Sequence, residues 1–152
     1  MTENMLGTNV VCQVAMVVRD IDAASAAWAA VLGVPKPPAR LTAPLAETDA
    51  RFRGQPTDAR AKLAFFDMGQ VNLELIEPVG RPSTWGEFLD TRGEGLHHIA
   101  FRVKGMDEIV ARLEAAGLPA VQRGNYTGGR YAYIDSQDKL KAILELLENT
   151  GK

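Results

Sequence analysis

Four polar side chains that interrupt mostly apolar stretches are the residues of this sequence best suited to chemistry. They are Gln13, Glu74, His98 and Glu145. Burying a lone carboxylate costs several kcal/mol, so a glutamate inside an apolar strand is normally paired or bound to a cation. One imidazole nitrogen, one amide oxygen and two carboxylates suit Co²⁺, Ni²⁺, Mn²⁺, Fe²⁺ or Zn²⁺, with open positions for water or substrate. These residues therefore predict a divalent metal site, provided that the fold brings them together.

An internal repeat in the sequence supplies the reason to expect this convergence. Residues 13–22 overlay on residues 98–107 without a gap, and residues 73–77 overlay on residues 144–148. The overlay aligns Gln13 with His98, and Glu74 with Glu145. Because two modules related by a pseudo-twofold axis bring equivalent positions together, the duplication predicts one cluster that contains all four side chains.

The elements that must position these residues follow the same predicted order in both halves: strand, helix, then two or three strands. Residues 1–78 form the first predicted module, residues 79–95 a linker with a short helix, and residues 96–152 the second module. The predicted strands cover residues 10–18, 51–54, 62–67, 71–77, 96–103, 120–122, 130–135 and 141–147, and the two long helices cover 21–32 and 106–116. Pro78 is expected to end its strand, and the glycine-rich residues 124–129 are expected to form a loop.

Strand alternation predicts which side chains share a face. His98 should face the same side as Ala100 and Arg102, and the neighbouring His97 should point the other way. Glu145 should face opposite to Glu148.

Each candidate also has a purely structural interpretation. A lone strand histidine such as His98 is more often a hydrogen-bonded core residue, and Gln13 alone could be a satisfied core amide. A glutamate near a strand end, such as Glu77 or Glu148, usually faces solvent. The matched positions in the two copies are what favours metal binding.

Composition and charge exclude several classes of function. The chain has 152 residues, with 17 Lys and Arg against 19 Asp and Glu, and its net charge of -2 argues against nucleic acid or an anionic membrane as the main partner. The single cysteine, Cys12, permits neither an internal disulfide nor a thiolate metal cage. No signal-peptide pattern opens the chain and no apolar stretch approaches the ~20 residues of a membrane span. We expect a cytoplasmic protein.

Three segments resemble the vicinal oxygen chelate superfamily, which includes glyoxalase I, methylmalonyl-CoA epimerase, extradiol dioxygenases and drug-binding resistance proteins. Residues 93–101 (GEGLHHIAF) look like the start of the second module of methylmalonyl-CoA epimerases, and residues 73–78 and 143–146 resemble the other ligand strands. The resemblance extends from about residue 10 to residue 148. It implies an α+β fold in which two tandem βαβββ modules form an incomplete barrel around a metal-binding cleft.

Carried over by position, the resemblance assigns the metal ligands to the same four residues. Gln13 falls where the family most often has histidine, and Glu74 falls where it has glutamine or glutamate. His98 and Glu145 fall on the usual histidine and glutamate. Glutamine at the first position weakens the dioxygenase interpretation, because two histidines and one carboxylate are the usual ferrous set for oxygen activation.

The chemistry that the resemblance implies is stabilisation of an enolate. A divalent metal binds two neighbouring oxygens of a carbonyl substrate as a Lewis acid, and a carboxylate moves the proton. Glu145 could serve as that base if it leaves the metal. A loose alignment makes Asp58 the candidate second acid, although a solvated loop aspartate is the alternative.

The remaining site candidates belong to a segment that closes over substrate in this family, or lie near it. Residues 123–133 match that segment, and Arg130 in it could meet a carboxylate or phosphate. A plain surface hairpin is the alternative. Arg102, Tyr126 and Tyr131 are candidate pocket residues.

The leading functional hypothesis is a metal-dependent isomerase or lyase that acts through an enolate on a small carbonyl or acyl-CoA substrate, as in methylmalonyl-CoA epimerase. A glyoxalase I-like lactoylglutathione lyase is the second hypothesis. A metal-free protein that sequesters a small molecule is the alternative from another class. Family analogy also implies a homodimer, with modules that could be exchanged between protomers.

Overall fold

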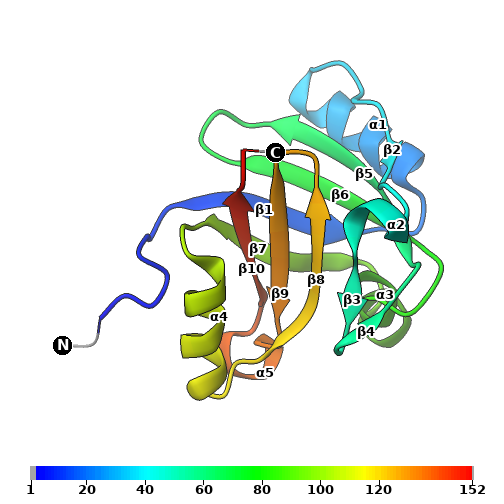
Figure 1. Cartoon of the computed structure of the whole chain (residues 1–152). Helices are drawn as coiled ribbons and strands as arrows, with labels where there is room; N and C mark the ends of the chain where they lie inside the picture. Colours follow the sequence, from blue (N-terminus) through cyan, green and yellow to red (C-terminus); the bar gives the residue numbers. More distant parts are fainter. Residues whose placement is uncertain (1–2, 152) are drawn as a thin grey trace.

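The structure, a computed structural model, describes residues 3–151, and over this range ten strands form one continuous curled sheet (Figure 1). The strand order is β2-β5-β6-β1-β7-β10-β9-β8-β3-β4. The strands are β1 (Val11–Val17), β2 (Arg40–Leu41), β3 (Arg51–Phe52), β4 (Gln55–Pro56), β5 (Arg60–Asp67), β6 (Asn72–Val79), β7 (Gly95–Arg102), β8 (Ala120–Tyr126), β9 (Gly129–Ile134) and β10 (Ile143–Asn149). The helices are α1 (Ile21–Leu32), α2 (Leu45–Thr48), α3 (Thr84–Arg92), α4 (Met106–Ala115) and α5 (Gln137–Leu140). The mixed α+β fold and the incomplete barrel expected from the sequence are confirmed.

The two halves of the sheet share the arrangement of their inner strands and meet where β1 and β7 pair antiparallel. Strand β6 runs parallel to β1, with Ala15 opposite Glu74. Strand β10 runs parallel to β7 in the same way, with Ala100 opposite Glu145. The shared register is what an internal duplication with a pseudo-twofold axis between β1 and β7 produces.

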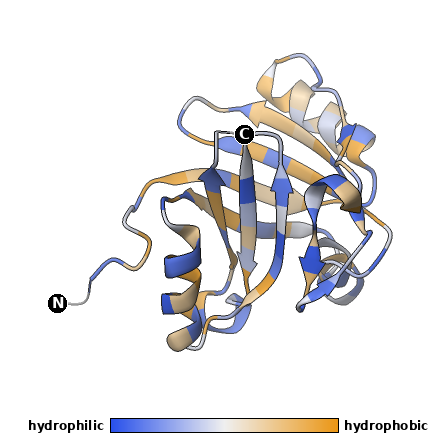
Figure 2. Cartoon of the chain, in the orientation of Figure 1, coloured by the Kyte–Doolittle hydropathy of each residue, from blue (hydrophilic) through white to orange (hydrophobic). Residues whose placement is uncertain are grey.

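Helices α1 and α4 cover the convex side of the two half-sheets, and each buries an apolar stripe there (Figures 1 and 2). Asp20 caps α1 by accepting a hydrogen bond from the Ala23 amide, and Gly33 ends it in the left-handed conformation at φ 66°. In α4 the stripe expected from spacing packs against alternate residues of β10. The contacting residues are Ile109, Val110 and Leu113 from the helix, and Leu144 and Leu146 from the strand.

Two carboxylates that were expected to face solvent instead cap these helices at equivalent positions. Glu77, in β6, accepts a hydrogen bond from the Ile21 amide at the start of α1. Glu148, in β10, accepts hydrogen bonds from the Gly105 and Met106 amides at the start of α4. The free N–H groups of a helix start attract a carboxylate, so the solvent-facing prediction was wrong for both residues.

The concave side holds a third core, which α3 closes at one end. Ala15, Val17 and Ile76 pack here with Trp85 of α3 and Tyr133 of β9. The indole Nε1 of Trp85 donates a hydrogen bond to the Tyr133 hydroxyl over 3.0 Å. The candidate site lies next to this apolar layer.

The short strand expected near residues 51–54 is present as β3 of the hairpin β3–β4, and it pairs with β8 of the second half, with Phe52 opposite Gln122. Two local predictions were wrong. The glycine-rich residues 124–129 belong mostly to the hairpin β8–β9 rather than to a long loop. Strand β6 continues through Pro78, which is tolerated because pairing with β1 ends at Ile76 and leaves β6 only one neighbour there.

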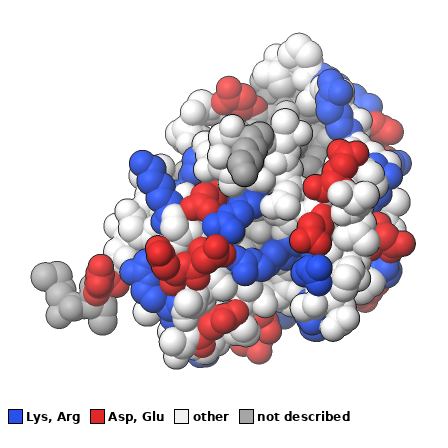
Figure 3. Space-filling view, viewed as in Figure 1, with Lys and Arg blue, Asp and Glu red and all other residues white. Residues whose placement is uncertain are grey.

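The surface agrees with the small net charge. Figure 3 shows acidic and basic side chains intermixed over the face in view. Within residues 3–151, none of the helices is both long and apolar enough to cross a membrane.

Candidate metal centre

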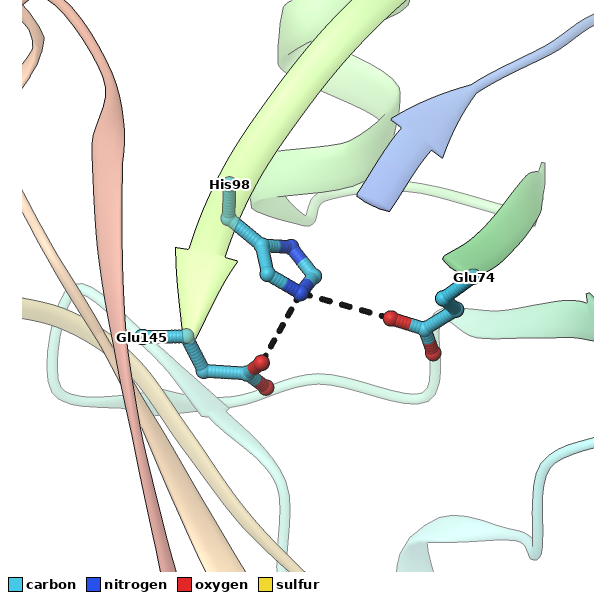
Figure 4. Close-up of side chains that lie close together, drawn as sticks. All are labelled: Glu74, His98 and Glu145. Atoms are coloured by element: carbon cyan, nitrogen blue, oxygen red, sulfur yellow. Dashed lines mark ion pairs between the residues drawn. The ribbon is translucent and has the colours of Figure 1, made fainter. Parts of the chain in front are cut away.

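Four adjacent strands of the sheet each contribute one of the predicted ligands. Gln13 lies on β1, Glu74 on β6, His98 on β7 and Glu145 on β10. These strands are neighbours in the order β6-β1-β7-β10, and all four side chains are buried. Figure 4 shows the His98 ring between the two glutamates, with its Nε2 atom toward both. The structure thus brings together the residues that the duplication aligned.

The polar atoms of the cluster lie at the spacing of ligands around one ion. His98 Nε2 is 2.8 Å from Glu145 Oε2, 3.3 Å from Glu74 Oε2 and 2.9 Å from Gln13 Oε1. Donor atoms that bind one ion at about 2.1 Å lie roughly 3 Å from their neighbours in the coordination shell. The two carboxylates and His98 therefore form a group able to hold a metal ion.

Small residues leave room for this cluster. Ala15 lies opposite both Glu74 and His98 in its neighbouring strands, and Ala100 lies opposite Glu145 and Gln13. Both alanines are completely buried. Since cross-strand partners share a face, a larger side chain at either position would occupy the space between the ligands.

The Gln13 amide provides a test of whether the cluster fits a cation. Its atom nearest the cluster lies 3.1 Å from Glu74 Oε2, 3.0 Å from Glu145 Oε2 and 2.9 Å from His98 Nε2. A carbonyl oxygen there faces two other acceptors, whereas an amino group has only two hydrogens for three neighbours. A cation at the centre would make every one of these atoms a favourable ligand, so the residues present fit a divalent metal.

Burial and charge also set the protonation of the cluster. Burial disfavours the charged imidazolium, but Glu145 and Glu74 outweigh it and raise the pKa of His98 to about 10. Burial likewise raises the pKa of Glu74, and the hydrogen bond and charge of His98 oppose that rise. Without a metal, a proton on His98 is therefore the charge that holds the two carboxylates together.

His97 does not point away from the cluster as strand alternation predicted. Ala15 pairs with His98 and Met16 pairs with Leu96, so His97 is the extra residue of a β-bulge. A bulge interrupts the alternation of side chains. The ring of His97 is buried, and its Nδ1 atom lies 2.8 Å from His98 Nδ1.

A cavity of about 600 Å³ opens beside the cluster on the concave side of the sheet. Gln13, Glu74 and Glu145 line it together with residues of both half-sheets. The other lining residues are Arg40, Leu41, Thr42, Ala43, Thr48, Ala50, Ala59, Leu63, Phe65, Asn72, Trp85, Arg102, Asn125, Tyr126, Thr127, Tyr131, Tyr133 and Leu147. An apolar and aromatic cavity with a few convergent polar groups is typical of a small-molecule site.

The other predicted site residues divide between the cavity and the surface. Arg102, Tyr126 and Tyr131 line the cavity. Arg130 does not, because its guanidinium is paired with Glu148 at 2.6 Å and with Asp107 at 3.2 Å. The structure places the segment 123–133 as a paired hairpin whose arginine stabilises the protein's own carboxylates.

Asp58 also lies outside the cavity. Its neighbours Thr57 and Ala59 are both buried, and Ala59 lines the cavity while Asp58 is exposed. Because alternate residues of an extended segment face opposite sides, Asp58 points to solvent.

Several cavity residues were missed by the sequence interpretation. Arg40 lies on the short edge strand β2, in a segment whose proline-rich sequence gave no clear pattern. The sequence interpretation placed Trp85 only in the short linker helix, and Tyr133 only at the end of the segment 123–133. Burial raises the pKa of Tyr133 well above its usual range and that of Tyr131 to about 12, so both hydroxyls keep their protons.

Comparison with known proteins agrees with this fold. Residues 12–133 match the model of the glyoxalase/bleomycin resistance protein/dioxygenase superfamily. The uncharacterized protein YqjC of Bacillus subtilis strain 168 is 33% identical over 97 residues, which cover 62% of this chain and 69% of that protein.

Two solved structures show the same architecture at low sequence identity. Methylmalonyl-CoA epimerase from Mycobacterium tuberculosis superposes with a TM-score of 0.63 at 22% identity, covering 99% of this chain and 93% of that one. A methylmalonyl-CoA epimerase in complex with methylmalonyl-CoA and NH₄⁺ also gives 0.63 at 22% identity, covering 92% and 94%. The family match extends over most of the chain and includes three of the four strands that carry the candidate ligands. The chain therefore belongs to the glyoxalase/bleomycin resistance/dioxygenase superfamily, the vicinal oxygen chelate proteins.

Proposed function

We propose that this protein is a metal-dependent isomerase or lyase that stabilises an enolate of a small carbonyl or acyl-CoA substrate, with methylmalonyl-CoA epimerisation as the leading reaction. The observation that carries the proposal is the convergence of Gln13, Glu74, His98 and Glu145 beside the cavity. When bound there, a divalent ion would act as a Lewis acid on the substrate carbonyl and acidify the adjacent C–H.

The proton carriers would come from the cluster itself. Among the described residues that line the cavity, Glu74 and Glu145 are the only carboxylates. Asp58 points to solvent, so its position does not support the role of second acid for this residue. We assign Glu145 as the base once it leaves the metal, and Glu74 as the carboxylate available on the other half of the pseudo-symmetric site.

The rest of the cavity supports a substrate that is anionic and partly apolar. Arg102 lies on the same face of β7 as His98 and is held by a 2.6 Å hydrogen bond to Asn149 Oδ1. Arg40 contributes a second guanidinium, and exposed Leu41 and Phe65 lie with it in the lining. Guanidinium groups bind carboxylates and phosphates, and the apolar wall would contact the acyl portion.

A glyoxalase I-like reaction is the second candidate. Isomerisation of a thiohemiacetal moves a proton between adjacent carbons, which one carboxylate can carry out. The described cavity lining holds no carboxylate other than the two candidate metal ligands, so it offers no separate second acid of the kind expected for the epimerase reaction, and this favours the simpler requirement. Homodimer formation also remains a prediction, because only one chain is described.

The deciding experiment measures metal content and then proton exchange. Purified protein should retain or recruit a stoichiometric divalent ion, and the metal-loaded protein should exchange the α-proton of methylmalonyl-CoA into deuterated water. Formation of lactoylglutathione from the thiohemiacetal of methylglyoxal and glutathione would instead identify the second candidate. Glu145→Gln should abolish either reaction, and Glu114→Gln on the exposed side of α4 is the matched control. A protein that recruits no metal but binds small molecules would be a binding protein and would contradict the proposal.

A further inference from the structure

His97 is a completely buried histidine that the proposed chemistry does not use. Its ring packs edge-on against Phe88 and Tyr133, each with a centroid distance of 5.3 Å. Its Nδ1 atom is 2.8 Å from His98 Nδ1, whereas its Nε2 atom has no hydrogen-bond partner among the described residues. His98 is thus the only hydrogen-bond partner of the His97 ring among the described residues.

The direction of this hydrogen bond follows from the surroundings of His98. A contact of this length between two ring nitrogens needs one N–H and one lone pair. His98 Nε2 faces Gln13, Glu74 and Glu145. If that nitrogen gives its lone pair to an ion, the single proton of the neutral ring must sit on Nδ1. His98 is then the donor, and His97 is the acceptor.

We propose that His97 is a positioning residue, whose Nδ1 accepts a hydrogen bond from His98 and holds it in the tautomer that presents Nε2 to the metal. This inference rests on the proposed metal-binding function. The β-bulge between Leu96 and His98 gives it a structural basis, because regular alternation would direct His97 to the other face of the sheet.

The choice of a histidine as acceptor has a consequence for charge. Histidine ligands usually donate their second N–H to a carboxylate, a backbone carbonyl or water. A third carboxylate here would add negative charge to a buried cluster that already holds Glu74 and Glu145. The imidazole of His97 fixes the tautomer without that addition.

Two substitutions separate positioning from packing. His97→Phe keeps an aromatic ring between Phe88 and Tyr133 but removes the acceptor. His97→Asn loses the ring but can place an amide oxygen near the position of Nδ1. Since loss of an outer-shell partner costs about 10- to 100-fold in metal affinity, we expect that loss for His97→Phe in a Co²⁺ titration. His97→Asn should bind within a few-fold of the unaltered protein.

The same proteins provide a readout that needs no metal. In ¹⁵N-labelled metal-free protein, a coupling between the two Nδ1 nuclei across the hydrogen bond should be detectable, and both substitutions should abolish it. Absence of that coupling in the unaltered protein would overturn the inference, as would equal Co²⁺ affinities for His97→Phe and the unaltered protein. An unaltered protein that binds no Co²⁺ would instead contradict the proposed function, and the positioning role would fall with it.

Discussion

At the scale of single residues, His98 links the chemistry of the site to pH. Its pKa of about 10 in the metal-free protein means that the imidazolium prevails at neutral pH. A metal must displace the Nε2 proton before it can bind. We predict that binding releases about one proton and that apparent affinity rises roughly tenfold per pH unit between pH 7 and pH 9.

Calorimetric titration of Co²⁺ in two buffers with different ionisation enthalpies measures the released proton directly. The control is His98→Gln, which should bind metal weakly and release no proton. A pH-independent affinity for the unaltered protein would contradict the assignment of His98 as a ligand.

The same pKa makes His98 a source of stability when no metal is present. Because the folded-state pKa of His98 lies above the ordinary value of about 6.5, the protonated ring contributes its full stabilisation below about pH 6.5. This contribution disappears as pH rises through about 10. His98→Leu would leave Glu74 and Glu145 buried without a cation. We predict a loss of about 3–5 kcal/mol in the unfolding free energy at pH 7, measured by urea denaturation.

Two observations would check the cause of that loss. The deficit of His98→Leu should shrink as pH falls, because burial raises the pKa of Glu74 and protonation removes the repulsion. The double substitution His98→Leu/Glu145→Gln should recover part of the stability. A deficit that is independent of pH would point to packing alone.

At the scale of secondary-structure elements, the two capping glutamates connect the sheet to its helices. Glu148 accepts hydrogen bonds from the first amides of α4 and pairs with Arg130. Burial alone would raise the pKa of Glu148, but Arg130 and the Met106 and Gly105 amides lower it below its usual range. This stabilisation is therefore present above about pH 4.3 and is lost as pH falls through the lowered folded-state value.

Glu148→Ala should lower the unfolding free energy by about 1–2 kcal/mol at pH 7, as expected for loss of a helix cap, and the difference from the unaltered protein should disappear in acid. Chemical denaturation at several pH values measures both effects. Glu114→Ala, on the exposed side of the same helix, is the control and should change stability little. Equal effects of the two substitutions would show that the Glu148 contacts are not stabilising.

The elements also show what could be predicted from the sequence. The faces of β6 and β10 followed from period-2 alternation, and the repeat aligned Glu74 with Glu145 because both copies keep the same register. The sequence did not reveal the bulge at His97, since a bulge depends on pairing with β1. Nor did it place Asp58 or Arg130, because exposure and ion pairing depend on residues distant in the chain.

At the scale of the whole molecule, the site belongs to neither half alone. The first half supplies Gln13 and Glu74, and the second supplies His98 and Glu145. The antiparallel pair β1–β7 is the seam between the halves. A bound ion would therefore connect four neighbouring strands across this seam, in addition to any catalytic role.

We predict that metal stabilises the protein as one cooperative unit. An ion that binds only the folded chain adds about 2.7 kcal/mol at a free concentration of 100 times its Kd, which for a chain of this size corresponds to a rise in Tm of about 5–10 °C. Calorimetry should show a single transition that moves upward with Co²⁺. Amides of β6, β1, β7 and β10 should gain protection from hydrogen exchange in both halves, and His98→Gln should lose most of both effects. Protection confined to one half would mean that the ion does not bridge the seam, and the shared site would then have to be reassigned to the ligands of that half alone.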